Sequence, residues 1–174
     1  MPSMLFGAHI SIAGGLENAP DNAAKLGCEV FQMFTRSPQG GAASKITPQV
    51  INKFRTRCEQ HILKEWVVHT PYYINFASEE SRIRAASVRI VREELERSSL
   101  LNAAYVMFHP GSSRTVGEKS GIKHSIEGIK KTLDGYKGDT RLLIEISAGA
   151  GAIIGDRFEE VAEILDGVGH PEMG

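Results

Sequence analysis

Three short apolar runs constrain the fold of this chain more than any other feature, because each carries near its end a side chain that can bind a metal. Residues 67–72, 107–112 and 143–147 hold His69, His109 and Glu145. The gaps of 40 and 36 residues fit one helix and its connections between successive parallel strands. Neighbouring strands lie about 4.8 Å apart, so the three side chains would emerge side by side at one sheet edge and converge on one ion. Taken singly, each residue is explained equally well without a metal, as a histidine whose hydrogen bonds are made within the protein or as a glutamate in a salt bridge. The shared register of all three favours the metal site.

The rest of the chain repeats the alternation of strand and helix. Apolar runs predict buried strands, in a parallel sheet covered on its faces, at residues 4–11, 29–34, 65–70, 104–109 and 141–146. Helical periodicity predicts helices at residues 16–26 and 122–133, one that begins at Thr47–Pro48 and one that Ser78 caps. A last helix is predicted to run from a capping box of Asp156 and Glu159 to Gly167, with Phe158 on its buried face. No linker interrupts these five βα units, so residues 1–174 are predicted to form a single domain.

Five βα units fit either an open doubly wound sheet or part of a (β/α)8 TIM barrel. A complete barrel takes about 250 residues, and this chain has 174. A sixth strand is expected at residues 170–174, where the chain stops. An incomplete barrel leaves sheet edges unpaired, which predicts self-association through them.

Composition says more about the cellular location of the chain than about its function. There are 20 basic and 21 acidic residues, and this balance gives no support to a nucleic-acid partner, although a local basic rim remains compatible with it. Cys28 and Cys58 form no disulfide framework, and the N-terminus has no signal peptide pattern, so a cytoplasmic location is expected. No apolar run approaches the roughly 20 residues that span a bilayer, so no membrane contact is expected.

Several motifs together resemble the N-terminal portion of the endonuclease IV family of apurinic/apyrimidinic endonucleases. They are Gly7-Ala8-His9-Ile10-Ser11 with Gly14-Gly15-Leu16, Phe34-Thr35-Arg36, His69 to Asn75, Phe108 to Ser112, and Ile144-Glu145 followed by Ala148-Gly149-x-Gly151. Their order along the chain is the order in the family, and they cover it from about residue 5 to the C-terminus.

The resemblance implies a xylose-isomerase-like TIM barrel with up to three zinc ions that acts in base excision repair. The family hydrolyses the phosphodiester 5′ to an abasic site in duplex DNA and leaves a 3′-hydroxyl. Carried over by position, His69 and His109 bind one zinc, and Glu145 bridges it to a second beside the attacking hydroxide, which makes Glu145 catalytic as well as a ligand. Tyr72, Arg36 and Ser112 are then expected to contact DNA, with Tyr72 inserted at the lesion.

The sequence also departs from the family pattern. Pro71 replaces the signature serine, Tyr73 takes an aliphatic position, and residues 37–41 are small and neutral where the family has a basic loop. The family's later zinc ligands would lie beyond Gly174. This chain is therefore expected to carry protein ligands for one zinc and part of a second, and to have little or no nuclease activity alone.

Other features have more ordinary interpretations. His9 is expected to hydrogen-bond near the site without binding metal directly. Gly149-Ala150-Gly151 does not predict a nucleotide cofactor, because Gly155 falls one residue late for the dinucleotide fingerprint. Arginines on the helix after Ser78 alternate with acids, which predicts a solvated face.

Two other functions remain open. One is a divalent-metal sugar isomerase or epimerase of the related xylose-isomerase-like barrels, although the arrangement of His69, Tyr72 and Asn75 favours the nuclease. The other is a non-catalytic fragment with a structural or weak DNA-binding role.

Overall fold

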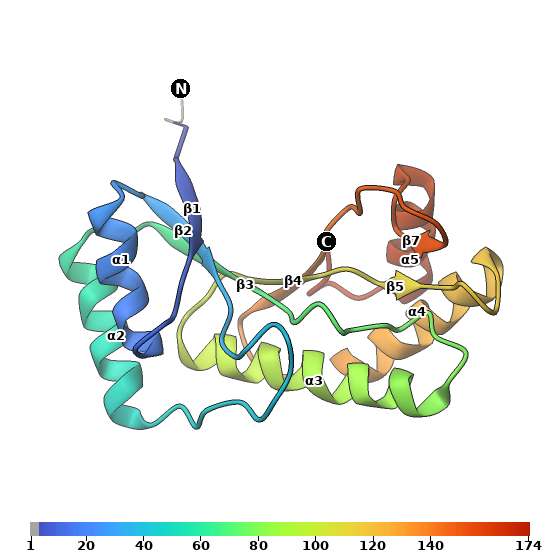
Figure 1. The fold of residues 1–174 in the computed structure, drawn as a ribbon, viewed down its shortest axis with the longest axis horizontal. Coiled ribbons are helices and arrows are strands. Elements are labelled where there is room, and N and C mark those ends of the chain that lie inside the picture. Colours follow the sequence, from blue (N-terminus) through green and yellow to red (C-terminus); the bar gives the residue numbers. More distant parts are fainter. Residues whose placement is uncertain (1–3) are drawn as a thin grey trace.

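A parallel β-sheet of five strands runs through the centre of the molecule (Figure 1). The computed structural model describes residues 4–174. Its strands follow in the order β1 (Gly7–Ile10), β2 (Val30–Met33), β3 (Glu65–His69), β4 (Tyr105–Phe108) and β6 (Arg141–Ile144). Every neighbouring pair is parallel. The five predicted βα units are therefore confirmed, and their sequential order is that of part of a (β/α)8 barrel.

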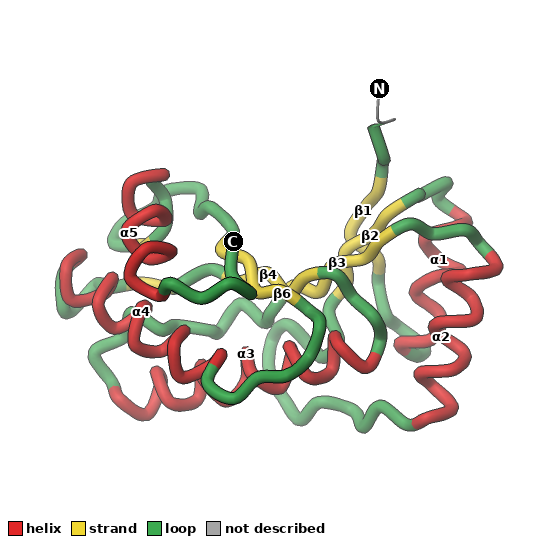
Figure 2. The backbone as a smooth tube through the Cα atoms, turned by 180° about the vertical axis from the view of Figure 1, so that it is seen from behind, coloured by secondary structure: helices red, strands yellow, loops and turns green. Residues whose placement is uncertain are grey.

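The helices between the strands lie along one side of the sheet, and the last helix lies beyond the end of the sheet opposite β1 (Figure 2). They are the 3₁₀ turn Leu16–Asn18, α1 (Ala19–Lys25), α2 (Pro48–Gln60), α3 (Ser81–Leu100), α4 (Glu118–Leu133) and α5 (Phe158–Val168). Thr47 caps α2 as predicted, because its hydroxyl accepts a hydrogen bond from the Val50 amide at 3.4 Å. Within the described residues no helix is long and apolar enough to cross a membrane.

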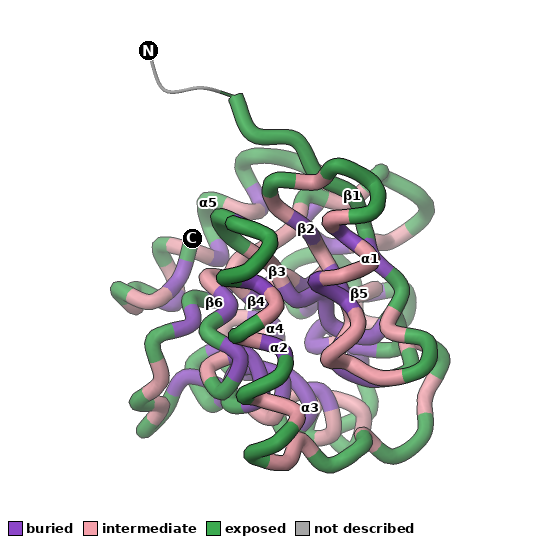
Figure 3. Tube along the Cα trace, turned by 90° about the vertical axis from the view of Figure 1, so that its left-hand side faces the viewer, coloured by how far each residue is buried: buried purple, intermediate pink, exposed green. Residues whose placement is uncertain are grey.

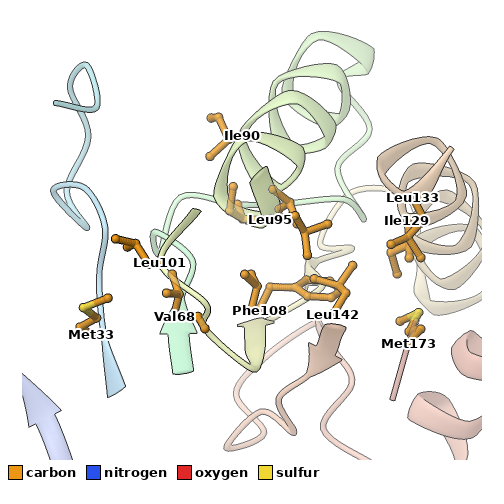
Figure 4. Close-up of a cluster of buried hydrophobic side chains, with 14 of the residues drawn as sticks. Met33, Val68, Ile90, Leu95, Leu101, Phe108, Ile129, Leu133, Leu142 and Met173 are labelled. Atoms are coloured by element: carbon orange, nitrogen blue, oxygen red, sulfur yellow. The ribbon is translucent and has the colours of Figure 1, made fainter. Parts of the chain in front are cut away.

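The hydrophobic core lies between the sheet and the helices, and Figure 3 marks the buried residues along the chain. Figure 4 shows Val68, Phe108 and Leu142 along three neighbouring strands, with Leu95 of α3 and Ile129 of α4 nearby. All five side chains are fully buried, and each such side chain stabilises the fold by about 1.5–3 kcal/mol. In β2 and β4, buried residues alternate with half-buried ones, whereas in β3 both Val68 and His69 are buried. The expectation of a sheet covered on both faces is therefore not met among the described residues.

The first strand is the clearest exception to the predicted burial. Gly7, Ala8 and His9 are exposed, and only Ile10 is buried. β1 pairs with β2 alone among the described strands, and His9 stays exposed although its ring packs against Phe34. The prediction of a buried first strand is wrong, because the apolar residues of an edge strand are buried only if another segment covers them.

The last residues of the chain pair with the opposite edge of the sheet. The Leu142 amide donates to the Glu172 carbonyl at 2.9 Å, and the Ile144 amide donates to the Gly174 carbonyl at 3.0 Å. Leu142 and Met173 form a parallel bridge. These residues occupy the place of the next strand, as the sequence predicts for residues 170–174.

Helix ends differ from prediction at α3 and α5. α3 begins at Ser81, because the Ser78 hydroxyl accepts from the Glu80 amide in the preceding turn instead of capping the helix. The N-terminal residue of α5 is capped by no side chain, and Phe158 is 79% exposed instead of buried.

The end of α5 also lies later than predicted. The helix continues to Val168, and Gly169 closes it in the left-handed conformation. Gly167 is inside the helix, where an added Cβ would lie 2.5 Å from Ile126 of α4. This glycine thus permits α4 and α5 to pack closely, and it is not a stop signal.

Candidate metal centre

The three predicted ligands meet at the carboxyl edge of the sheet. His69 is the last residue of β3, His109 directly follows β4, and Glu145 directly follows β6. These strands are neighbours, so the backbone delivers the side chains to one place. One ligand atom from each lies within 4.8 Å of the others. The structure thereby brings together all three candidates that the spacing singled out.

The hydrogen bonds of the two imidazoles decide which nitrogen faces the centre. His69 Nδ1 lies 2.6 Å from the Thr70 carbonyl oxygen, and His109 Nδ1 lies 3.2 Å from the Glu145 carbonyl oxygen. Carbonyl oxygens only accept, so each Nδ1 carries a hydrogen, and in the neutral imidazole each Nε2 then offers its lone pair to the centre.

Both Nε2 atoms point toward the same carboxylate oxygen. Glu145 Oε2 lies 3.1 Å from His69 Nε2 and 3.5 Å from His109 Nε2. This oxygen is buried and has no hydrogen-bond partner. With both imidazoles neutral, these three atoms are acceptors that face one another, and a cation between them satisfies all three. The donor set therefore fits a metal ion, and imidazole and carboxylate are ordinary ligands of zinc.

A cavity of about 640 Å³ opens beside these atoms. Its lining includes His109, Glu145, Tyr72 and Ser112. His69 is buried at the back of the group, whereas the side chains of His109 and Glu145 are each 36% exposed. The centre is therefore open to water and to a ligand from one side.

Aromatic rings form the wall next to His69. The Tyr72 ring centroid lies 5.6 Å from that of His69, and Phe34 lies 5.5 Å from both rings. Tyr72 remains 68% exposed, so most of its surface is available at the rim. His9 packs on Phe34 at 4.6 Å, and its Nδ1 pairs with Gln32 Oε1 at 2.6 Å. It makes no hydrogen bond to the three ligands.

The structure does not bring Arg36 to this cavity. Arg36 is only 6% exposed, and its guanidinium binds Glu94 and Glu93 of α3. The surface that it was expected to offer to DNA is therefore not exposed. The reason is a buried carboxylate, Glu94, that the sequence did not distinguish from its exposed neighbours.

Ser112 lies at the cavity, held by a pair of hydrogen bonds to Asn75. The Asn75 Oδ1 atom accepts from the Ser112 amide, and Asn75 Nδ2 donates to the Ser112 carbonyl, both at 3.1 Å. Ser112 belongs to β5 (Gly111–Ser112), which pairs antiparallel with β7 (Ile153–Ile154). This short ribbon was not predicted, because two residues give no periodicity.

Sequence reasoning also missed Ser147. Its hydroxyl oxygen lies 3.2 Å from His109 Nδ1. The available signal was its position two residues after Glu145, since alternate residues of an extended chain point to the same side.

Comparison with known proteins bears on the fold and the family. The family model described as "Xylose isomerase-like TIM barrel" matches residues 20–174. This chain belongs to that family. The partial TIM barrel that the sequence predicted is thereby confirmed.

Relatives within this family support the resemblance to endonuclease IV. The chain is 39% identical over 172 residues to a protein of Carboxydothermus hydrogenoformans named "Probable endonuclease 4", an alignment that covers 98% of this chain and 60% of the relative. The crystal structure of endonuclease IV from Thermus thermophilus superposes with a TM-score of 0.83 at 33% identity, covering 93% of this chain and 59% of that one. The chain thus spans about 60% of the length of these relatives, and the predicted family resemblance is confirmed.

A more distant likeness concerns the fold alone. The crystal structure of a D-tagatose 3-epimerase-like protein matches with a TM-score of 0.72 at 18% identity, covering 97% of this chain and 63% of that one. Barrels of this type therefore share the backbone, and function has to be argued from the site.

Proposed function

We propose that this chain carries part of the active site of a zinc-dependent apurinic/apyrimidinic endonuclease of base excision repair. Its substrate is duplex DNA with an abasic site, and the reaction hydrolyses the phosphodiester 5′ to the lesion and leaves a 3′-hydroxyl. The observation that carries the proposal is the meeting of His69, His109 and Glu145 as three acceptors beside an open cavity. The likeness to proteins named endonuclease 4 selects the substrate class.

His69 and His109 would hold one zinc through Nε2, and Glu145 through Oε2. A bound zinc supplies a hydroxide nucleophile near neutral pH and neutralises charge on the phosphate. Glu145 has a second carboxylate oxygen, which would be free to contribute to a further zinc site. The described residues would thus supply ligands for one zinc and part of a second.

Tyr72 and Ser112 would meet the DNA at the rim of the cavity. The exposed Tyr72 ring offers a flat apolar face that can replace the missing base in the stack. Ser112 lines another part of the same cavity wall, and its hydroxyl would turn from the Ala152 carbonyl, 3.2 Å away, to reach the DNA. We assign no DNA contact to Arg36, whose charge is already balanced by Glu94 and Glu93.

Further predictions about the whole chain accompany this proposal. The chain acts as a single domain in the cytoplasm, where its two free cysteines stay reduced. No nucleotide cofactor or membrane takes part. The free edge of β1 favours self-association of the chain, which sedimentation at several concentrations would detect.

The test combines metal content with binding and cleavage of an abasic duplex by the purified 174-residue chain. We expect about one zinc per chain, tighter binding to abasic than to intact duplex, and little or no cleavage. The zinc is lost in His109→Ala and kept in His61→Ala, because His61 pairs with Asp21 on the helical side.

Each contrary outcome removes a different part of the proposal. Absence of zinc in the wild type would overturn the metal centre. Robust cleavage with two or more zincs would show that the site is not incomplete. Turnover of a ketohexose without preference for abasic DNA would favour the sugar epimerase alternative.

A further inference from the structure

Ser147 contacts the nitrogen of His109 that faces away from the proposed metal. Its Oγ lies 3.2 Å from His109 Nδ1, and the Glu145 carbonyl oxygen lies 3.2 Å from the same nitrogen. The carbonyl can only accept, so the Nδ1 hydrogen lies between two oxygens. The serine hydroxyl is then a second acceptor for one imidazole hydrogen.

The two histidines differ in how much they need such support. His69 is 6% exposed and has one short bond, 2.6 Å, to the Thr70 carbonyl. His109 is far more exposed, and its backbone bond is long. A single long bond leaves the ring freer to rotate, and a second acceptor on the other side restricts that rotation.

The backbone of Ser147 is itself fixed to α5. Its amide donates to the Gly155 carbonyl at 2.8 Å, and the Gly155 amide donates to Glu160 Oε2 at 2.7 Å. Glu160 is 4% exposed and binds Arg157. The hydroxyl is therefore placed by a connected series of bonds from the sheet to a helix.

We infer that Ser147 is a positioning residue for His109: it holds the imidazole with Nδ1–H turned to the loop and Nε2 turned to Glu145. This inference rests on the proposed metal centre and adds to it a residue that lines the same cavity and acts on the metal through His109. Loss of such an outer contact typically weakens metal binding about 10- to 100-fold.

The test uses a pair of substitutions with the same shape. Ser147→Thr keeps the hydroxyl, whereas Ser147→Val replaces it with a methyl group. We expect about tenfold weaker zinc binding for Ser147→Val in competition with a chelator, and an affinity for Ser147→Thr within about threefold of the wild type. The visible spectrum of bound Co²⁺ should change in the valine variant alone.

A matched control separates this role from general loop stability. The Ser113 hydroxyl donates to the Ala152 carbonyl at 3.2 Å and joins the same two loops without touching His109. Ser113→Ala should leave zinc affinity unchanged, and thermal unfolding of each metal-free variant shows whether it folds. Equal zinc affinity of Ser147→Thr and Ser147→Val would overturn the inference.

A second measurement does not require metal. Long-range nitrogen–proton NMR spectra report which imidazole nitrogen carries the hydrogen. We expect the Nδ1–H form of His109 in the wild type and Ser147→Thr, and a larger Nε2–H population in Ser147→Val. Failure of the wild type to bind zinc would overturn the metal centre, while these spectra would still decide the role of Ser147. Identical His109 spectra for the wild type and Ser147→Val would overturn the positioning role of Ser147.

Discussion

Arg36 and Glu94 form a buried ion pair that joins the segment after β2 to the middle of α3. Glu94 is fully buried, and its other carboxylate oxygen accepts a hydrogen bond from the Thr35 hydroxyl at 2.6 Å. Arg97 donates to the same hydroxyl at 2.8 Å and to the Ser44 carbonyl at 2.8 Å. This network holds both ends of the loop that follows β2, at the same edge of the sheet as the metal centre.

Charge and burial shift the pKa values of the two arginines of this network in opposite directions. Burial lowers the pKa of Arg36, but the charge of Glu94 and the hydrogen bonds to Glu93 and Glu94 outweigh it and raise the pKa overall. For Arg97, burial dominates and lowers the pKa, although the charge of Glu94 opposes it. Glu94 is therefore the residue on which both buried cations depend.

Removal of Glu94 should be strongly destabilising. Glu94→Ala leaves the two arginines without their buried counter-charge, so we expect the free energy of unfolding to fall by about 3–5 kcal/mol in urea titrations. Glu93→Ala is the matched control, because Glu93 binds the same Arg36 at 3.0 Å but is 40% exposed. That change should cost less than about 1 kcal/mol. Similar losses for the two variants would contradict the buried role of Glu94.

Zinc should stabilise the folded chain through Glu145. At a free zinc concentration about 100 times the dissociation constant, binding adds about 2.7 kcal/mol to the free energy of unfolding. Thermal unfolding with and without a chelator should show this gain in the wild type and in Glu163→Ala, which removes an exposed carboxylate of α5. Glu145→Ala should lose it. An undiminished response in Glu145→Ala would exclude this residue as a ligand.

Tyr72 should affect DNA binding without affecting stability. Its side chain is largely exposed, so Tyr72→Ala should change the free energy of unfolding by less than about 0.5 kcal/mol. Stacking of one base on an aromatic ring contributes about 1–3 kcal/mol, which predicts roughly a tenfold loss of affinity for abasic duplex in fluorescence anisotropy. Phe158→Ala is the control, because Phe158 is also largely exposed but does not line the cavity. A loss of affinity in both variants would argue against a specific role of Tyr72.

The cysteines should differ in reactivity. Burial, with a smaller contribution from Glu59, raises the pKa of Cys58 to about 12 from 9.0. The unfolded chain therefore loses this proton first, and folded stability falls as pH rises between these two values. The thiolate is the reactive form, so at about pH 9 a thiol reagent should label half-buried Cys28 and leave Cys58 unmodified until the chain unfolds. Mass spectrometry of labelled peptides would show early Cys58 labelling if its burial were incorrect.

The sequence predicts that the three candidate ligands meet, because the relevant geometry is local to each strand. A ligand at the carboxyl end of a parallel strand is delivered to one edge whatever the connecting helices do. His69, His109 and Glu145 therefore follow from strand ends and spacing alone. The hydroxyl of Ser147 was accessible to the same reasoning through its position relative to Glu145.

The features that sequence could not predict depend on contacts between distant segments. Arg36 meets Glu94 across 58 positions, and Glu94 looks like any other acid in a charged helix until the loop folds over it. Gly167 resembles a helix stop, but its role depends on Ile126 of α4. The exposure of β1 likewise depends on which segments cover it, and its own residues do not specify that.

The close approach of Gly111 and Asn75 gives the last prediction. Gly111 has φ +107°, and an added Cβ would lie 2.7 Å from the Asn75 Cα and collide with its side chain. Gly151, with φ +67° and no atom within 4 Å of an added Cβ, is the matched control. Gly151→Ala bears only the backbone strain of about 1–2 kcal/mol. Gly111→Ala adds a steric clash of about 1–3 kcal/mol and displaces Asn75 from Ser112. Urea unfolding should rank the wild type above Gly151→Ala and Gly151→Ala above Gly111→Ala, and equal costs for the two variants would show that Asn75 is free to move away.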